Sequence, residues 1–153
     1  MPSFSTKRRV RHAASDMFDL VADVEKYPDF VPLCAGMKVR SSHDKGEGVT
    51  AMIAEMTVAY KMIRQSFTCR ATLDRPQLHI LVEYLDGPFS RMQNRWSFRG
   101  TGEGTCEVEF FIDYEFKSRT LAMLMGAMFD TAFRKFAAAF EKRADEVYGG
   151  KTT

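Results

Sequence analysis

Apolar and polar residues alternate along most of the chain between residues 37 and 116, with the period of two that is typical of half-buried β-strands. The clearest segment is residues 106–116, where Val108, Phe110 and Ile112 alternate with acidic residues. A weaker alternation opens the chain. The predicted strands cover residues 2–10, 37–42, 50–60, 63–73, 78–84, 91–99 and 106–116.

The period changes after the last strand. From Ser118 to Tyr148 the apolar residues recur at the spacing of an amphipathic α-helix, with Asp130 and Arg134 on the face opposite Phe136. The first half of this helix differs, because residues 121–129 contain no polar side chain. The extra apolar face is either covered by other elements, or it lines a ligand cavity or touches a membrane.

Two short helical segments are predicted before the series of strands. The first is expected to begin at a cap formed by Ala14 or Ser15. Pro28 then limits the next segment to one helical turn, which Tyr27 and Phe30 anchor.

The turns between the strands are short and rich in Gly, Pro and Asp, as at residues 74–77 and 100–104, so the strands must pair antiparallel. Strict alternation means that one face of the sheet is buried, and only the final helix is large enough to cover it. We therefore expect an α+β fold in which a curved antiparallel sheet of about seven strands wraps around the final helix. The chain 1–153 is interpreted as one domain, with a frayed tail at residues 149–153.

The overall charge is nearly balanced. The 153 residues include 22 Lys and Arg against 20 Asp and Glu, which gives a net charge of +2. This balance offers no argument for a nucleic-acid partner, and no DNA binding is expected. Lys7, Arg8, Arg9 and Arg11 do cluster, either as a solvated face or as a contact for phosphate or anionic lipid.

The cysteines and the apolar runs bear on the compartment. The chain has three cysteines, Cys34, Cys69 and Cys106. Because their number is odd and no two of them form a CxxC motif, neither a disulfide framework nor a metal site is expected. No apolar run reaches the roughly 18 residues that a membrane-spanning helix needs, and the N-terminus lacks a signal-peptide core. The expectation is a soluble intracellular protein, at most peripheral to a membrane.

The inward face of the sheet and helix is the candidate binding site. Most of its large side chains are expected simply to form the core, but ten methionines and thirteen phenylalanines also provide a soft lining that suits an oily ligand. Gln65 and Asn94 interrupt the apolar pattern, and a buried amide must bond to the other amide, to water or to a ligand carbonyl. The candidate cavity residues are Met52, Met56, Gln65, Phe67, Tyr84, Asn94, Trp96, Phe98, Phe110, Tyr114, Met125, Met128, Phe129 and Phe136.

No catalytic set is visible in the sequence. The three histidines, His12, His43 and His79, are scattered, and none has a nucleophile, carboxylate or second metal ligand at an informative spacing. The Gly-rich residues 100–104 precede a strand rather than a helix, so they do not form a phosphate-binding loop. No catalytic or metal-binding residue is therefore assigned.

Three stretches resemble one known family. They are residues 21–32 (VADVEKYPDFVP), residues 87–98 from Gly-Pro-Phe to Trp-Ser-Phe, and residues 140–149 (FEKRADEVYG). Together they are similar to the coenzyme-Q-binding START-like family of the polyketide cyclase/dehydrase superfamily, whose bacterial members include ribosome association toxins. The resemblance implies a helix-grip fold over nearly the whole chain.

The resemblance also implies a function. Its quinone-binding members imply non-enzymatic binding of ubiquinone (coenzyme Q) or a similar isoprenoid lipid that supports respiration, with no catalytic cofactor. The expected location is the cytoplasm, with peripheral contact to the inner membrane as the further option. The alternative is a toxin-like protein that binds the large ribosomal subunit and blocks subunit association. Its basic surface would be formed by Lys7, Arg8, Arg9 and Arg11 with Arg91, Arg95 and Arg99. A cyclase or hydrolase on the same fold is a third alternative.

An isoprenoid ligand needs an opening that can face lipid. Residues 27–33, the start of the final helix and the exposed aromatic of the loop 87–89 are expected to meet there. In the alternative interpretation, Phe30 and Met123 pack on each other and close the fold. The candidate mouth and membrane-contact residues are Tyr27, Phe30, Phe89, Met123 and Leu124.

Overall fold

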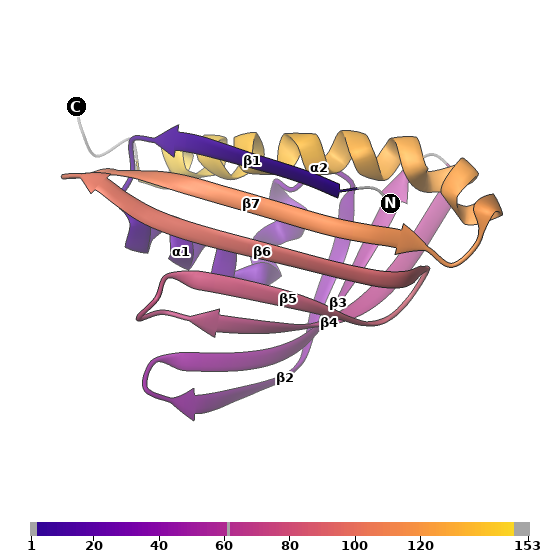
Figure 1. Cartoon of the computed structure of the whole chain (residues 1–153), viewed down its shortest axis with the longest axis horizontal. Helices are drawn as coiled ribbons and strands as arrows, with labels where there is room; N and C mark the ends of the chain where they lie inside the picture. The colour runs from indigo at the N-terminus through magenta and orange to yellow at the C-terminus, as the bar shows by residue number, and fades with distance from the viewer. Residues whose placement is uncertain (1–2, 61, 149–153) are drawn as a thin grey trace.

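The computed structural model describes residues 3–60 and 62–148 of the chain (Figure 1). Its elements are β1 (Ser3–Val10), α1 (Ala14–Ala22), the 3₁₀ helix η1 (Val24–Asp29), β2 (Cys34–Gly46), β3 (Val49–Tyr60), β4 (Ile63–Asp74), β5 (His79–Asp86), β6 (Phe89–Gly102), β7 (Thr105–Phe116) and α2 (Arg119–Val147). Pro2 of the first predicted strand and the predicted tail 149–153 lie outside the described residues.

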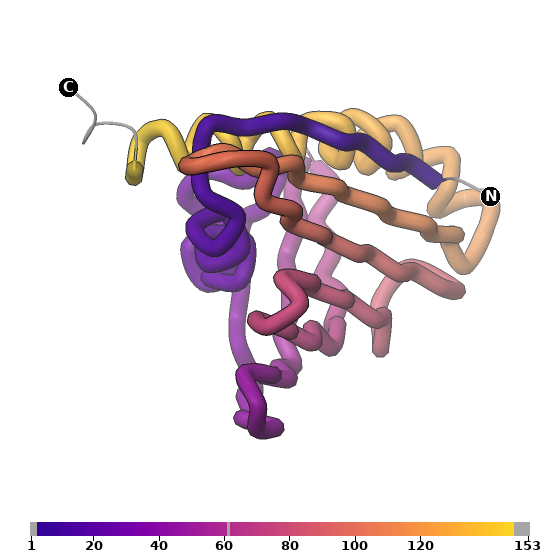
Figure 2. Tube along the Cα trace, turned by 60° about the vertical axis from the view of Figure 1, so that its left-hand side comes forward, coloured from indigo at the N-terminus to yellow at the C-terminus, as the bar shows by residue number. Residues whose placement is uncertain are grey.

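All strand pairs are antiparallel and form one seven-stranded sheet with the order β1-β7-β6-β5-β4-β3-β2. The first strand thus pairs with the last, and β2 lies at the opposite edge. Figures 1 and 2 show the sheet curving while α2 runs along β1 and β7. The predicted α+β fold, a curved sheet wrapped around a long C-terminal helix, is confirmed.

The pattern of apolar residues explains why α2 packs where it does. Its N-terminus is capped by Ser118, whose Oγ accepts a hydrogen bond from the backbone N of Leu121 at 3.1 Å. One face, which includes Phe129, Phe133 and Phe140, is buried against the sheet. Trp96 of β6 lies between the sheet and the helix, with its ring 4.7 Å from Phe110 and 5.1 Å from Phe140.

The short helices differ slightly from the prediction. The cap of α1 is Ala13, which makes no side-chain hydrogen bond, so the prediction of a cap at Ala14 or Ser15 is wrong. Both residues already have helical conformation because the chain turns directly after β1. The single turn predicted around Tyr27 is the 3₁₀ helix η1, which includes Pro28.

The antiparallel order gives the sheet two distinct ends. The β3–β4 turn, the β5–β6 turn and the β7–α2 connection lie at one end, with Tyr60, Met62, Leu85, Pro88 and residues 117–124. We call it the apolar end, because large apolar side chains are exposed there. The opposite, polar end carries the β2–β3, β4–β5 and β6–β7 turns at residues 46–49, 74–79 and 102–105.

Candidate functional site

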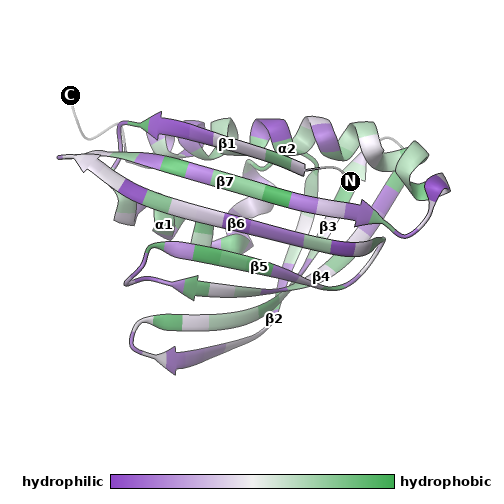
Figure 3. Cartoon of the chain, viewed as in Figure 1, coloured by the Kyte–Doolittle hydropathy of each residue, from purple (hydrophilic) through white to green (hydrophobic). Residues whose placement is uncertain are grey.

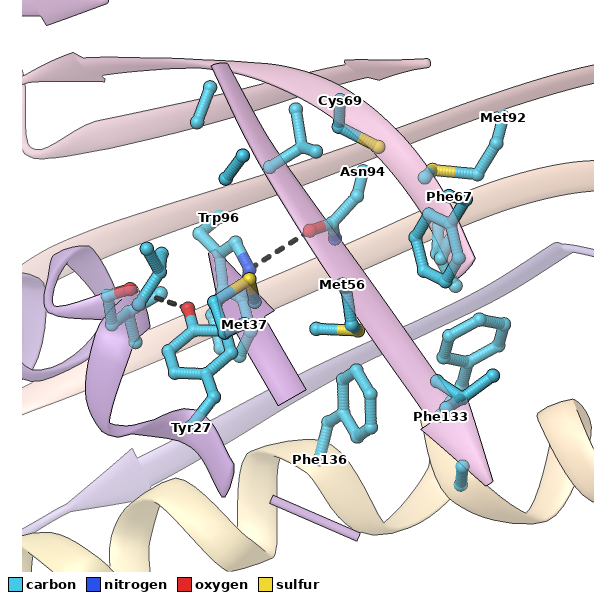
Figure 4. A pocket seen from close by; sticks show the side chains of 18 of the residues that line it. Tyr27, Met37, Met56, Phe67, Cys69, Met92, Asn94, Trp96, Phe133 and Phe136 are labelled. Atoms are coloured by element: carbon cyan, nitrogen blue, oxygen red, sulfur yellow. Dashed lines mark hydrogen bonds between the residues drawn. The ribbon is translucent and has the colours of Figure 1, made fainter. Parts of the chain in front are cut away.

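A cavity of about 100 Å³ lies between the sheet and α2 (Figure 4). Almost all of its lining is apolar. Four methionines, Met37, Met56, Met92 and Met128, contribute flexible side chains to it. The other lining residues are Val21, Val24, Tyr27, Pro32, Leu33, Ala54, Val58, Phe67, Cys69, Ala71, Leu73, Ile80, Val82, Phe89, Asn94, Trp96, Ile112, Phe129, Ala132, Phe133, Phe136 and Phe140.

The space exists because small side chains lie opposite one another at the centre of the fold. Ala54 of β3 pairs with Cys69 of β4, and Ala71 follows two residues later on the same face. Ala132 provides the facing position on α2. Larger residues at these positions would fill the gap between sheet and helix, as Trp96 does nearby.

The structure brings together half of the predicted cavity residues. Met56, Phe67, Asn94, Trp96, Met128, Phe129 and Phe136 line the space. Met52, Gln65, Tyr84, Phe98, Phe110, Tyr114 and Met125 do not line it. The alternation identified their face correctly, but it does not tell how far along a strand the cavity extends.

The residues outside the cavity have other roles in the fold. Phe98 packs edge-on against Phe18 of α1, with ring centroids 5.9 Å apart. Tyr84 accepts a hydrogen bond from the backbone N of Phe89 at 3.0 Å. Gln65 is half-buried on β4.

Residues of the η1–β2 connection and of β2 were missed as cavity residues, although they line the cavity. Leu33 and Met37 both line it. Leu33 has a positive φ of 66°, which a leucine rarely adopts, and its carbonyl accepts a hydrogen bond from Ala59 N at 3.0 Å. The only sequence signal was the inward phase of Met37, since a left-handed leucine leaves no periodic pattern.

Asn94 brings a side-chain amide to the cavity lining, and this amide is held in place. The Nδ2 donates to the backbone O of Phe111 at 2.8 Å, and the Oδ1 accepts from Trp96 Nε1 at 3.1 Å (Figure 4). Gln65, one of the three partners considered for this amide, is not among these contacts. Because a primary amide has two N–H donors and two acceptor lone pairs, each end of Asn94 keeps one further hydrogen-bonding position.

The titratable groups of the cavity are held neutral. Burial raises the pKa of the Cys69 thiol to about 12. Burial also raises the pKa of Tyr27, whose hydroxyl donates to the backbone O of Val21. Neither group is a nucleophile or a base near neutral pH in this state.

The predicted mouth is wrong in two respects. Phe89 was expected to be exposed, but it is 1% exposed and packs against Phe67, Phe116 and Phe129 at centroid distances of 5.5, 5.1 and 5.4 Å. It therefore closes the apolar end of the cavity from within. Tyr27, also assigned to the mouth, is buried in the lining.

The second error concerns distance along the helix. The Phe30 ring lies 5.1 Å from Phe140, near the C-terminal half of α2. Met123 is in the first turns of the same helix, roughly 25 Å away at 1.5 Å per residue. Phe30 and Met123 therefore neither share a rim nor pack on each other. Met123 and Leu124 are exposed, by 85% and 61%.

The cationic residues considered for a ribosome contact are mostly paired. Lys7 and Arg8 lie within ion-pair distance of Glu109 and Glu141. On the outer face of the sheet, Arg91 pairs with Asp113 and Arg99 with Glu107. The guanidinium of Arg95 stacks 4.4 Å from the ring of Phe111.

His12 lies away from the cavity. It is buried in the connection between β1 and α1, and its Nε2 is 2.7 Å from Asp145 Oδ1 of α2. The pair links this connection to the final helix. Within the described residues no group of three or more His, Cys, Asp or Glu side chains is arranged to hold a metal ion.

Comparison with known proteins identifies the family. Residues 10–141 match the family described as polyketide cyclase / dehydrase and lipid transport. The chain belongs to this family. The resemblance expected from the sequence is thereby confirmed at the level of the superfamily and of its relatives.

Two relatives carry different names. Ribosome association toxin RatA of Escherichia coli (strain K12) is 33% identical over 151 residues, which is 99% of this chain and 92% of that protein. The mitochondrial coenzyme Q-binding protein COQ10 homolog B of Xenopus laevis is 30% identical over 150 residues, which is 95% of this chain and 59% of that protein.

A solved structure extends the range of functions on this fold. The Zhui aromatase/cyclase from Streptomyces sp. R1128 superposes with a TM-score of 0.82, covering 99% of both chains at 15% identity. At this identity the likeness shows the fold alone. Enzymes and binding proteins thus share this architecture, and the side chains of the site must decide between them.

Proposed function

We propose that the chain binds a hydrophobic lipid of the isoprenoid quinone class, with ubiquinone as the ligand, in the cavity between the sheet and α2. The supporting observation is an apolar, methionine-rich cavity with one fixed amide at Asn94. An isoprenoid tail needs dry apolar walls, and a quinone carbonyl needs a hydrogen-bond donor. The remaining N–H of Asn94 is such a donor.

The cavity must widen to accept this ligand. Its volume of about 100 Å³ is below the roughly 150 Å³ of an engineered cavity that binds benzene and the roughly 300 Å³ at which ligand pockets begin. Methionine rotamers change at low cost, so movement of Met37, Met56, Met92 and Met128 supplies part of the space. We place the entrance for the ligand between β3 and α2, where Met56 and Phe136 both line the cavity (Figure 4).

Binding proceeds without a chemical step in this proposal. Cys69 and Tyr27, the titratable groups of the lining, have raised pKa values and stay protonated. His12 lies outside the cavity and is bonded to Asp145. The lipid is carried or stored in the cytoplasm and at the inner membrane, where it supports respiration. The name of COQ10 homolog B agrees with a quinone ligand.

Extraction and titration test this proposal. Organic extracts of protein purified from its native host should contain ubiquinone at near one molecule per chain by mass spectrometry. A short-chain ubiquinone should quench the fluorescence of Trp96, the single tryptophan of the chain. Absence of any isoprenoid quinone from the extract, together with an unchanged Trp96 signal, would remove the proposal.

Two substitutions sharpen the test. Ala71→Leu fills the cavity and should abolish the quenching, whereas Ala138→Leu on the exposed face of α2 should leave it unchanged. Asn94→Leu keeps the size of the side chain but removes the donor. It should weaken binding about tenfold, because one hydrogen bond is worth roughly 1–1.5 kcal/mol.

Ribosome association is the second candidate, supported by the similarity to RatA. The paired state of Lys7, Arg8, Arg91 and Arg99 weakens the basic surface that it needs. Cosedimentation with large ribosomal subunits over a salt series distinguishes the two candidates. A complex that weakens steeply with salt and is lost when Arg8, Arg9 and Arg11 are replaced by Ala favours the ribosome, and quinone binding should hardly respond to salt.

A further inference from the structure

The exposed large apolar side chains gather at one end of the molecule. In the described part of the chain they are Tyr60, Met62, Leu85, Met123, Leu124 and Val147. All of them except Val147 belong to the apolar end, where the β3–β4 turn, the β5–β6 turn and the start of α2 meet. Met62 is 98% and Met123 85% exposed, so neither contributes to the core.

The topology places the turns that carry these residues at the same end of the sheet. Antiparallel neighbours must turn at alternating ends, so the turns after β3, β5 and β7 share one end. Figure 1 shows the ends of β3 and β4 reaching the first half of α2, and Figure 3 shows the first turns of α2 coloured as hydrophobic. At this end α2 exposes Met123 and Leu124 on neighbouring sides of one helical turn.

Three cations and two acids lie at this end among the described residues. Lys117 and Arg119 are exposed directly before the apolar turns of α2, and Arg64 is exposed just after the β3–β4 turn. Within the described residues, none of the three takes part in an ion pair. The acids nearby are Asp86 in the β5–β6 turn and Glu115, which accepts a hydrogen bond from Ser90.

We propose that the apolar end is a docking surface for an anionic lipid bilayer. The unpaired cations meet negatively charged head groups, while Met62, Met123 and Leu124 enter the apolar boundary beneath them. The exposed groups come from separate turns and project singly. A folded protein partner would need a matching socket for each, whereas a fluid bilayer adapts to all of them.

This surface rests on the proposed function and adds a location to it. Phe89 closes the cavity directly behind the β5–β6 turn, so docking brings the buried aromatic end of the cavity to the membrane. The entrance between β3 and α2 then begins beside the lipid surface, since β3 ends at Tyr60. A quinone that leaves the bilayer follows an apolar path from Met62 along β3 toward Met56.

Vesicle cosedimentation tests the docking surface. The protein is mixed either with pure phosphatidylcholine vesicles or with vesicles in which about one third of the lipid is phosphatidylglycerol. The wild type should bind the anionic vesicles more tightly. Met62→Asp and Met123→Asp should each weaken that binding about tenfold or more, because a methionine that enters the bilayer is exchanged for a charge. Lys117→Gln and Arg119→Gln should each weaken it about fivefold on anionic vesicles only.

Val147→Asp is the matched control. It places the same charge on an exposed apolar position of the same helix, but away from the apolar end. Its vesicle binding should equal that of the wild type. All of these positions are exposed, so unchanged thermal melting by circular dichroism is expected for every variant.

The outcomes separate docking from ligand binding. No vesicle binding by the wild type, or equal loss in Val147→Asp and Met123→Asp, overturns the docking surface. The same holds if Met62→Asp instead abolishes self-association in sedimentation velocity, since a second copy would then cover this end. Titration of Trp96 with a short-chain ubiquinone in vesicle-free solution is independent of docking. Normal quenching without vesicle binding would support quinone binding and contradict the docking surface. Vesicle binding without quenching would support the docking surface and contradict quinone binding.

Discussion

The turns at the two ends of the sheet are stabilised in different ways. At the polar end, side chains within the turns bond to the turn backbone. Asp44 accepts a hydrogen bond from Gly46 N at 2.8 Å, and Asp74 accepts one from Gln77 N at 3.2 Å. At the apolar end the β5–β6 turn instead rests on the buried ring of Phe89. The comparison teaches that the β5–β6 turn depends on a buried core residue, whereas these two polar-end turns depend on local hydrogen bonds, although all of them are short.

Phe89→Ala should show the largest difference between the ends. Removing a fully buried ring that contacts several others should lower the free energy of unfolding by about 3–5 kcal/mol. Asp74→Ala at the polar end removes a single turn hydrogen bond and should lower it by about 1 kcal/mol. Urea denaturation of both variants measures the difference. Equal losses would mean that Phe89 is not the support of its end.

Gly87→Ala tests how tightly the β5–β6 turn fits over the core. Gly87 has a φ of 147°, and an added Cβ would lie 2.5 Å from the Cβ of Phe67. We expect the free energy of unfolding to fall by about 2–4 kcal/mol, because the costs of backbone strain and of overpacking add together. Gly46→Ala at the polar end is the control, since its φ is 87° but no atom lies within 4 Å of the new Cβ. The free energy of unfolding of Gly46→Ala should fall by only about 1 kcal/mol. A similar decrease in both variants would show that the β5–β6 turn rearranges to accommodate the added Cβ.

Gly126→Ala is the smallest expected effect and has the opposite sign. Gly126 lies within α2 near the exposed apolar turns, and no atom lies within 4 Å of an added Cβ. The substitution should raise the free energy of unfolding by about 0.5–1 kcal/mol through lower entropy of the unfolded chain. Ala127→Gly should lower the free energy of unfolding by a similar amount. If neither variant changes the urea midpoint, the first turns of α2 are not stably helical.

The sequence predicted the architecture because the signals for it are local. Alternation such as that of residues 106–116 defines a strand and its buried face without knowledge of its neighbours. The cavity depends instead on where small side chains coincide. Ala54, Cys69 and Ala71 are separate in sequence and meet only through the pairing of β3 and β4. Small residues in the inward phase of adjacent strands were the signal that could have found it.

The mouth was predicted wrongly for a related reason. Phe89 follows Gly87 and Pro88, a sequence typical of an exposed turn, but it is already the first inward residue of β6. The apolar stretch around Phe30 lies near the far half of α2, and neither composition nor periodicity tells which end of a long helix a distant segment meets. By contrast, the exposure of Met123 followed from its phase, since it projects where charged residues lie later in the helix.

The irregular register of β2 has a consequence for aggregation. This edge strand shifts register against β3 between Cys34 and Gly36, between Val39 and Ser41, and between Asp44 and Gly46. An edge with such bulges does not present an uninterrupted row of backbone donors and acceptors to another sheet. Lys38, which is exposed on this strand, adds a positive charge that would repel the same strand of another copy. Despite its open edge, the sheet is therefore protected against fibril-like strand addition from the β2 side.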